Sequence, residues 1–281
     1  IGVRLVGSEM CIRDRCTTAD TSIGAAQYAF IYHLVEAQNC QHLKFGTSSA
    51  VDLTIQFYVK SNLTGTTCGF LAKEDTTYCQ APFEFTINST NTWEKKVVTI
   101  PANAVIQASS SIINNDNGPG IGIGFNLLLG GNFDNGTNLT WETGGASYAT
   151  TNVLNFLSST DNDFFITGLQ VEVGSGASDF EHLPFDVELQ RCFRYYISYS
   201  PLVNGGDNTD YVANGSYYTD TVFNAIINLP TMMRTDPSII DSNSSDYYRI
   251  YRSAGNDAIA SFDTSGCLLY TSDAADEEDS V

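Results

Sequence analysis

Apolar and polar residues alternate strictly along several segments of the chain. In the segment 51–60 the apolar side chains fall on every second residue, and polar side chains fill most of the positions between them. Because successive side chains of a strand point to opposite faces, this period of two predicts a strand with one buried face. Similar alternation predicts further strands over 83–87, 93–100, 121–129 and 164–173.

Short runs rich in Gly, Asn and Ser separate these segments and are typical of tight turns. Strands at this spacing predict an all-β fold over 16–180, a β-sandwich or jelly roll. Cys68 and Cys79 flank a segment expected to fold as a hairpin that turns near Lys73 and Glu74. A cross-strand disulfide is conceivable in an oxidising compartment, but we interpret the pair as two buried free thiols. No Cys-X-X-Cys pair is present, so no structural zinc is expected.

One segment carries the helical period instead. Its apolar residues recur at spacings of three and four and form a single stripe, which predicts one connecting α-helix within 181–201. Pro184 precedes the stripe and Pro201 ends it. The stripe consists of Leu189, Cys192, Phe193, Tyr196 and Ile197.

After Pro201 the alternating pattern returns and predicts a second, small β domain over 202–266. Asn214-Gly215 is a strong signal for a hairpin turn, and it lies between Tyr211-Val212 and Tyr217-Tyr218. Short strands are predicted over 222–229, 238–240, 247–251 and 259–262.

The chain is strongly acidic, with 13 Lys and Arg, 32 Asp and Glu, and a formal net charge of −19. So few cations cannot neutralise a row of phosphates, and we expect no nucleic acid partner. The same charge disfavours an anionic membrane surface. No apolar run approaches the roughly 20 residues that cross a bilayer, so no membrane insertion is expected.

The sequence offers little support for catalysis or metal binding. His33, His42 and His182 stand apart from any nucleophile or metal-ligand pattern, and neither Gly-X-Ser-X-Gly nor His-Glu-X-X-His occurs. A carboxylate pair drawn from distant strands would be invisible in sequence, but nothing points to one, so we expect no enzyme. The oxygen-rich runs 114–118 and 161–163 lack EF-hand spacing and are interpreted as turns rather than calcium sites.

The glycine-rich run 118–124 superficially suggests a dinucleotide loop, but it lacks the strand before and the helix after that such a loop needs. Its glycines alternate with Ile121 and Ile123, so we expect them to line one face of a strand. A face without side chains lets a ligand or another backbone approach closely.

Exposed aromatic side chains can stack on sugar rings, and four are candidate carbohydrate-binding residues: Trp141, Tyr148, Tyr78 and Trp93. Trp93 opens a predicted strand after a polar turn, so we interpret it as a core residue. Trp141 lies in a loop-rich stretch, and buried and exposed positions stay equally open for it.

Both ends of the chain resemble translated sequencing-library adapters, in inverted orientation. The matching segments are Met10-Cys11-Ile12-Arg13-Asp14-Arg15 and 267–277. The resemblance implies that 1–15 and 267–281 are not natural protein and that the protein continues beyond one or both of them. Setting both ends aside removes three arginines and seven acidic residues and leaves a net charge of −15. We expect these ends to pack poorly, because nothing selected their residues to fit.

Several segments together resemble a family of phage virion proteins, tail-fibre-like and common in marine viruses. The most specific is Phe180-Glu-His-Leu-Pro-Phe, which runs into Glu188-Leu-Gln-Arg-Cys-Phe-Arg-Tyr-Tyr. The others are 18–24, 57–61, 91–101, 162–174 and 229–237. The resemblance implies a carbohydrate-binding-module-like jelly roll over 16–180, a linker helix over 181–201 and an incomplete distal β domain over 202–266.

The resemblance also implies a function. It suggests a non-enzymatic protein of a tail fibre or appendage, located on the virion, with host-surface glycans, other virion proteins and copies of itself in a trimer as partners. Related sugar-binding jelly rolls often place an Asp in the last strand to hold a structural calcium. Thr167 and Gly168 stand at the comparable place, which puts that calcium in doubt. The rival interpretations are a carbohydrate-binding module of a secreted bacterial polysaccharide-degrading enzyme and a purely structural virion spacer.

Overall fold

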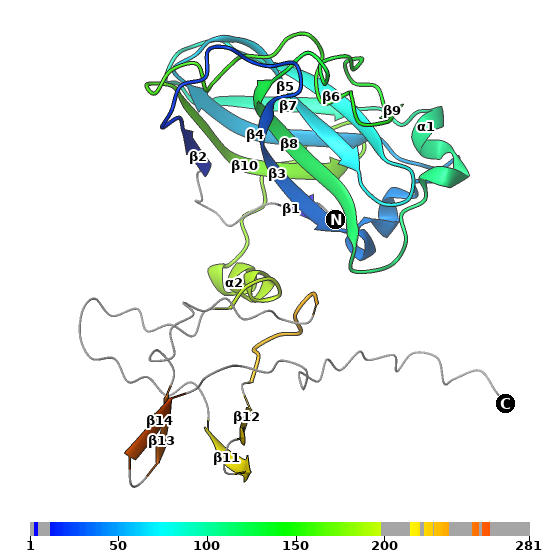
Figure 1. The fold of residues 1–281 in the computed structure, drawn as a ribbon. Helices are drawn as coiled ribbons and strands as arrows, with labels where there is room; N and C mark the ends of the chain where they lie inside the picture. The colour runs from blue at the N-terminus through cyan, green and yellow to red at the C-terminus, as the bar shows by residue number, and fades with distance from the viewer. Residues whose placement is uncertain are drawn as a thin grey trace, which may run out of the picture. The chain divides into compact units, whose positions relative to one another are not determined.

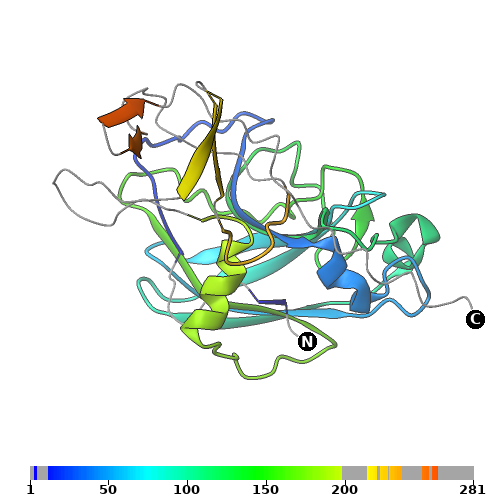
Figure 2. The same ribbon diagram turned by 90° about the horizontal axis from the view of Figure 1, so that it is seen from below.

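The structure, a computed structural model, describes residues 3–4, 12–197, 214–219, 222–226, 228–235, 249–252 and 255–258. The chain divides into two units, Ile1–Phe185 and Asp186–Val281. Figure 1 labels the helices and strands of both units, and Figure 2 shows them turned by 90°.

The first unit consists of two antiparallel sheets. One, the β8 sheet, has the strand order β3-β8-β5-β6-β9. Its strands are β3 (Tyr28–Glu36), β8 (Pro119–Leu129), β5 (Gly65–Lys73), β6 (Cys79–Ile87) and β9 (Glu142–Thr143). The other, the β10 sheet, contains β10 (Asp163–Val173), β4 (Leu53–Ser61) and β7 (Glu94–Ile100), with β1 (Val3–Arg4) and β2 (Ile12–Arg15) paired to β10.

The chain crosses repeatedly between the two sheets: β3, β5, β6, β8 and β9 lie in one, and β4, β7 and β10 lie in the other. This crossing back and forth gives a jelly-roll sandwich, and the predicted all-β fold class is confirmed (Figure 1). The expected strands over 51–60, 83–87, 93–100, 121–129 and 164–173 are all present within a few residues of their predicted bounds.

The apolar face of each alternating strand fills the space between the sheets. Phe57 of β4 is fully buried, and its ring lies 5.1 Å from Phe85 and 4.9 Å from Phe125 of the opposite sheet. Each such ring contributes about 1.5–3 kcal/mol by leaving water. The sequence pattern therefore fixes which residues form the core.

The predicted hairpin around Lys73 is confirmed, with β5 pairing β6 along its whole length. Cys68 lies opposite Glu84 and Cys79 lies opposite Lys73, so the two cysteines do not face each other. Both thiols are free and buried, as interpreted from the sequence.

Strand β3 was not predicted. Its sequence, Tyr-Ala-Phe-Ile-Tyr-His-Leu-Val-Glu, is apolar on both sides, so the period of two is hidden. Three short helical segments were also missed, because one or two turns carry too few repeats for a periodic signal. They are η1 (Ala37–Leu43), α1 (Ala104–Gln107) and η2 (Ser109–Ser111).

The connecting helix is confirmed as α2 (Phe185–Phe193), but it ends before the apolar stripe does. The amides of Arg194 and Tyr195 bond to the carbonyl oxygens three residues before them, at 3.3 and 2.9 Å. This tightening ends the helix and leaves Tyr196 and Ile197 beyond it. Among the helices of the described residues, none is long and apolar enough to cross a membrane.

In the second unit the described strands form two hairpins, β11 (Asn214–Thr219) with β12 (Val222–Ile226), and β13 (Arg249–Arg252) with β14 (Gly255–Ala258). The predicted turn at Asn214-Gly215 is wrong, because both residues lie within β11 and the chain reverses between Thr219 and Val222. A Cβ on Gly215 would collide with the backbone of Asn224. This glycine therefore permits close pairing of the strands rather than a turn. The predicted strands over 238–240 and 259–262 lie outside the described residues.

The outer face of the β10 sheet is covered by the segment 174–181. Thr54 donates to the carbonyl of Gly174 at 2.6 Å, and Gln56 donates to the carbonyl of Ser178 at 2.9 Å. Strands β1 and β2 add backbone pairing at the edge of β10. The expected poor packing of 1–15 and 267–281 concerns side chains that lie outside the described part of the chain.

Candidate functional site

Aromatic side chains gather on the outer face of the β8 sheet. Strand β3 supplies three of them, β5 supplies one, and three come from connections between strands. We name this set the aromatic face; it consists of Tyr28, Phe30, Tyr32, Phe70, Tyr78, Phe133 and Tyr148.

Glycines of β8 form the floor beneath two of these rings. A Cβ on Gly122 would collide with the phenol of Tyr32, and a Cβ on Gly124 would collide with the ring of Phe70. The expectation that the glycines line one strand face is confirmed. Rings of this chain, rather than a ligand, occupy the space that they leave.

The rings stack in depth from the sheet to the surface. Tyr28 and Phe30 are nearly parallel, at 12° and 5.3 Å between centroids, and Phe30 stacks on Tyr148 at 5.7 Å. Phe70 supports Tyr148 edge-on at 4.9 Å and is fully buried, whereas Tyr28 is 56% exposed. Such pairs contribute about 0.5–1.5 kcal/mol beyond the area they bury. The arrangement is a rigid apolar platform with an exposed ring at its front.

The phenol groups form a hydrogen-bonded rim. Tyr32 donates to a carboxylate oxygen of Glu74. Gln80 donates to the Tyr78 hydroxyl at 3.1 Å, and Tyr78 donates to the Tyr148 hydroxyl at 3.3 Å. Burial raises the pKa of Tyr32, helped by its bond to Glu74, and burial also raises the pKa of Tyr78. The phenols of Tyr32 and Tyr78 therefore stay protonated at physiological pH.

The connection that carries Tyr148 is held firmly on the sheet. Asn126 donates to the carbonyl oxygens of Tyr148 and Cys68, at 2.9 and 3.2 Å. Two residues further along, Thr150 donates to Glu84 at 2.6 Å. These bonds fix the position of the Tyr148 ring before any ligand arrives.

Of the four aromatic residues selected from the sequence, the structure brings together Tyr78 and Tyr148. Trp141 is only 1% exposed and packs edge-on against Phe45 in the core, so it is not available for stacking. Trp93 is 40% exposed, and its interpretation as a core residue is wrong. It lies on the β10 sheet, where the Lys60 amino group is 5.1 Å from its ring centroid.

Sequence reasoning missed Tyr28, Phe30 and Tyr32, which form the largest part of the face. Their spacing of two was the available signal, since three aromatic residues at i, i+2 and i+4 of a strand share one face. Phe133 had no comparable signal, because its position depends on the path of the connection between strands.

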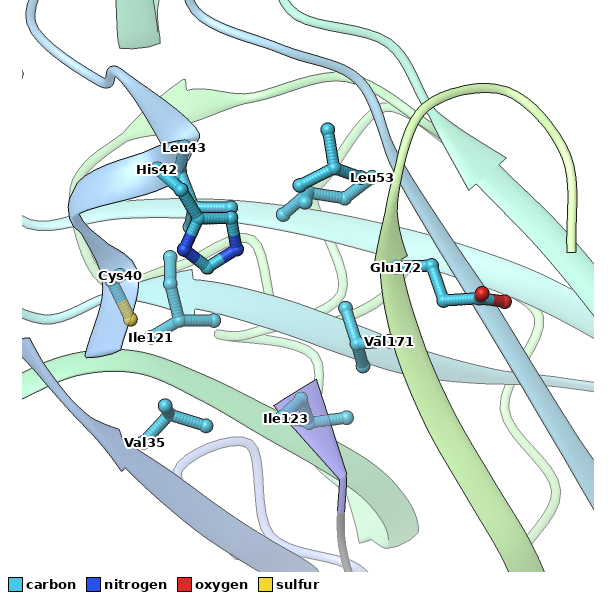
Figure 3. Close-up of a pocket in the computed structure, with 10 residues that line it drawn as sticks. Val35, Cys40, His42, Leu43, Leu53, Ile121, Ile123, Val171 and Glu172 are labelled. Carbon is cyan, nitrogen blue, oxygen red and sulfur yellow. The ribbon is translucent and has the colours of Figure 1, made fainter. Parts of the chain in front are cut away.

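A narrow gap opens between the sheets near η1 (Figure 3). Its lining is almost wholly apolar, and the carboxylate of Glu172 points away from it. The His42 Nε2 atom, at this gap, has no hydrogen-bond partner among the described residues, and burial lowers the pKa of this imidazole. A lining without converging polar groups offers nothing to orient a ligand, so we regard the gap as part of the core.

The turn interpretation of 114–118 is supported by Asp116, which accepts the amide of Gly118 at 2.8 Å. Within the part of the chain that the structure describes, no three His, Cys, Asp or Glu side chains come together as a metal ion would need.

Comparison with known proteins gave no relatives. No protein-family model, no curated protein and no solved structure matches the chain. Function is therefore inferred from the arrangement of side chains and from the resemblance of short sequence segments.

Proposed function

We propose that this protein binds glycans without catalysis and that sugar rings stack on the aromatic face. The observation that supports this most is Tyr28, a ring more than half exposed yet backed by Phe30 and Tyr148. One side of a sugar ring presents C–H groups that suit an aromatic surface, and its edge presents hydroxyl groups. The phenols of Tyr78 and Tyr148 and the carboxylate of Glu74 provide donors and acceptors for that edge.

Rigidity of the platform favours this function. Association costs free energy for each side chain that must be ordered, about 0.5–1.5 kcal/mol for a flexible one. Here Gly122 and Gly124 let the rings lie on the strand, and Asn126 holds the Tyr148 backbone, so most of the ordering precedes binding.

The biological setting is proposed from the sequence resemblance. It suggests a phage tail fibre or appendage, on the virion, in which the jelly roll contacts glycans of the host surface and the fibre assembles as a homotrimer. A strictly monomeric mass for the full-length protein would count against the fibre. Hydrolase genes beside its gene would favour the alternative, a module of a polysaccharide-degrading enzyme.

A glycan array tests the binding function directly. The full chain is expected to bind at least one glycan, and Tyr28→Ala is expected to weaken that binding about tenfold, the upper end of an aromatic contact. Trp93→Ala is the matched control, since it removes an exposed aromatic ring from the other sheet. If the unmodified chain binds no glycan on the array, the proposal is overturned. If Trp93→Ala loses binding and Tyr28→Ala does not, the binding site lies at Trp93 rather than on the aromatic face.

A further inference from the structure

The surroundings of the aromatic face carry negative charge. Glu74 accepts from Tyr32 at one side. Glu84 and Glu142 both bond to the connection that carries Tyr148, through Thr150 at 2.6 Å and Ser147 at 2.7 Å respectively. One carboxylate therefore bonds directly to a ring of the face, and two more bond to the connection that carries Tyr148.

Within residues 16–185, few positive charges are available to balance these carboxylates: the Lys73 ammonium interacts electrostatically with Glu74, but it is buried. Between Cys16 and Phe185 the chain has 15 acidic residues, five lysines and no arginine. Three of the lysines, Lys60, Lys95 and Lys96, belong to β4 and β7 of the other sheet. Lys73 is buried, with its amino group bonded to Asp75 and Thr76, and Lys44 follows η1. In the described chain, the cation–ring contacts join Lys60 to Trp93 and Phe165, both outside the aromatic face.

Recognition of sulfate, phosphate or uronate groups requires the opposite arrangement, with Arg or Lys placed to pair with the anion. Repulsion between a ligand anion and one carboxylate about 8 Å away weakens binding about two- to threefold in water. Each further carboxylate at that distance weakens binding by a similar factor. Uncharged sugar hydroxyls suffer no such repulsion and can donate to the same carboxylates.

We infer that the glycan bound by this protein is uncharged: its sugars carry hydroxyl groups but no sulfate, phosphate or uronate. This inference rests on the proposed glycan-binding function and narrows it to a substrate class.

Matched pairs of polysaccharides test the inference with the full chain. Suitable probes are dextran and dextran sulfate, agarose and κ-carrageenan oligosaccharides, and methyl-esterified and de-esterified oligogalacturonides. For any pair that is bound, we expect the neutral member to bind at least about tenfold tighter than the charged member at low salt. At about 0.5 M salt the charges are screened, so we expect the difference in affinity between the two members to be smaller. Equal or tighter binding of a charged member would overturn the inference while leaving glycan binding intact.

Two variants locate the source of the discrimination. Glu74→Gln keeps an acceptor for Tyr32 but removes one charge. The dissociation constant of the charged glycan divided by that of its neutral partner should therefore fall about two- to threefold. Asp179→Asn removes the same charge from the segment that covers the β10 sheet, and it should leave the ratio unchanged. If a charged glycan binds only with added calcium and EDTA reverses it, the carboxylates are cation ligands and the inference fails. If no glycan, neutral or charged, binds in the array or in the pairs, the proposed function fails, and the inference fails with it.

Discussion

At the residue scale, a single carboxylate organises the turn between β6 and β7. Glu94 accepts hydrogen bonds from the backbone amides of Asn88 and Ser89, both at 2.8 Å, and from Lys96 at 2.6 Å. The bond from Lys96, with those from the turn, lowers the pKa of Glu94 from 4.5 to about 2. The folded state thus holds this group ionised at pH values where the unfolded chain protonates it.

This shift predicts a pH dependence of stability. Because the folded pKa lies below the unfolded one, the contribution of Glu94 is complete above about pH 4.5 and is lost as the pH falls towards 2. Glu94→Gln should therefore unfold at lower urea concentration than the unmodified chain at pH 7, and the difference should shrink at pH 3. A difference that is constant between these pH values would contradict the role of the charge.

A second residue-scale prediction concerns the glycine floor. Gly122→Ala should push the Tyr32 ring off the strand, with an overpacking cost of about 1–3 kcal/mol and weaker glycan binding. Gly145→Ala is the control, since a Cβ there meets nothing within 4 Å. Urea unfolding and glycan affinity measured on both variants check this. Equal stability and equal glycan affinity of the two variants would show that the position of the Tyr32 ring does not depend on Gly122.

At the element scale, alternation of apolar and polar residues was sufficient to find β4, β6, β8 and β10, and its absence hid β3. In β4 the period of two separates Phe57, fully buried, from Tyr58, which is 38% exposed. In β3 both faces are apolar because one faces the core and the other carries three rings of the aromatic face. The strand that contributes most to the candidate site was therefore missed by the alternation of apolar and polar residues.

The contrast within β4 gives a prediction. Phe57→Ala should cost about 3–5 kcal/mol, because it empties a site between the sheets that the fold cannot fill. Tyr58→Ala should cost about 1 kcal/mol or less, as for most surface substitutions. Urea denaturation of both variants measures this. Similar losses would contradict the assignment of the two faces.

At the scale of the whole molecule, only part of the candidate site was predictable. Tyr78 and Tyr148 were selected for their residue type, yet what joins them is a bond between hydroxyls from residues 70 positions apart. Trp93 was misjudged and Trp141 was left open because exposure depends on how the connections cross the sheets, which no local pattern records. The jelly roll itself followed from patterning, since its core depends on many repeated positions rather than on one contact.

The two sheets of the sandwich also differ in what lies outside them. The segment 174–181 covers the β10 sheet through Thr54 and Gln56, while the β8 sheet presents the aromatic face. The central claim is that this second surface is the one that binds glycans.

Amide chemical-shift mapping tests that claim most directly. A glycan identified on the array is titrated into the isotopically labelled full chain. We predict shifts over Tyr28–Tyr32 and around Tyr148, with β7 and the 174–181 segment unaffected. Shifts confined to the surroundings of Trp93, or to strands of the β10 sheet, would contradict the claim.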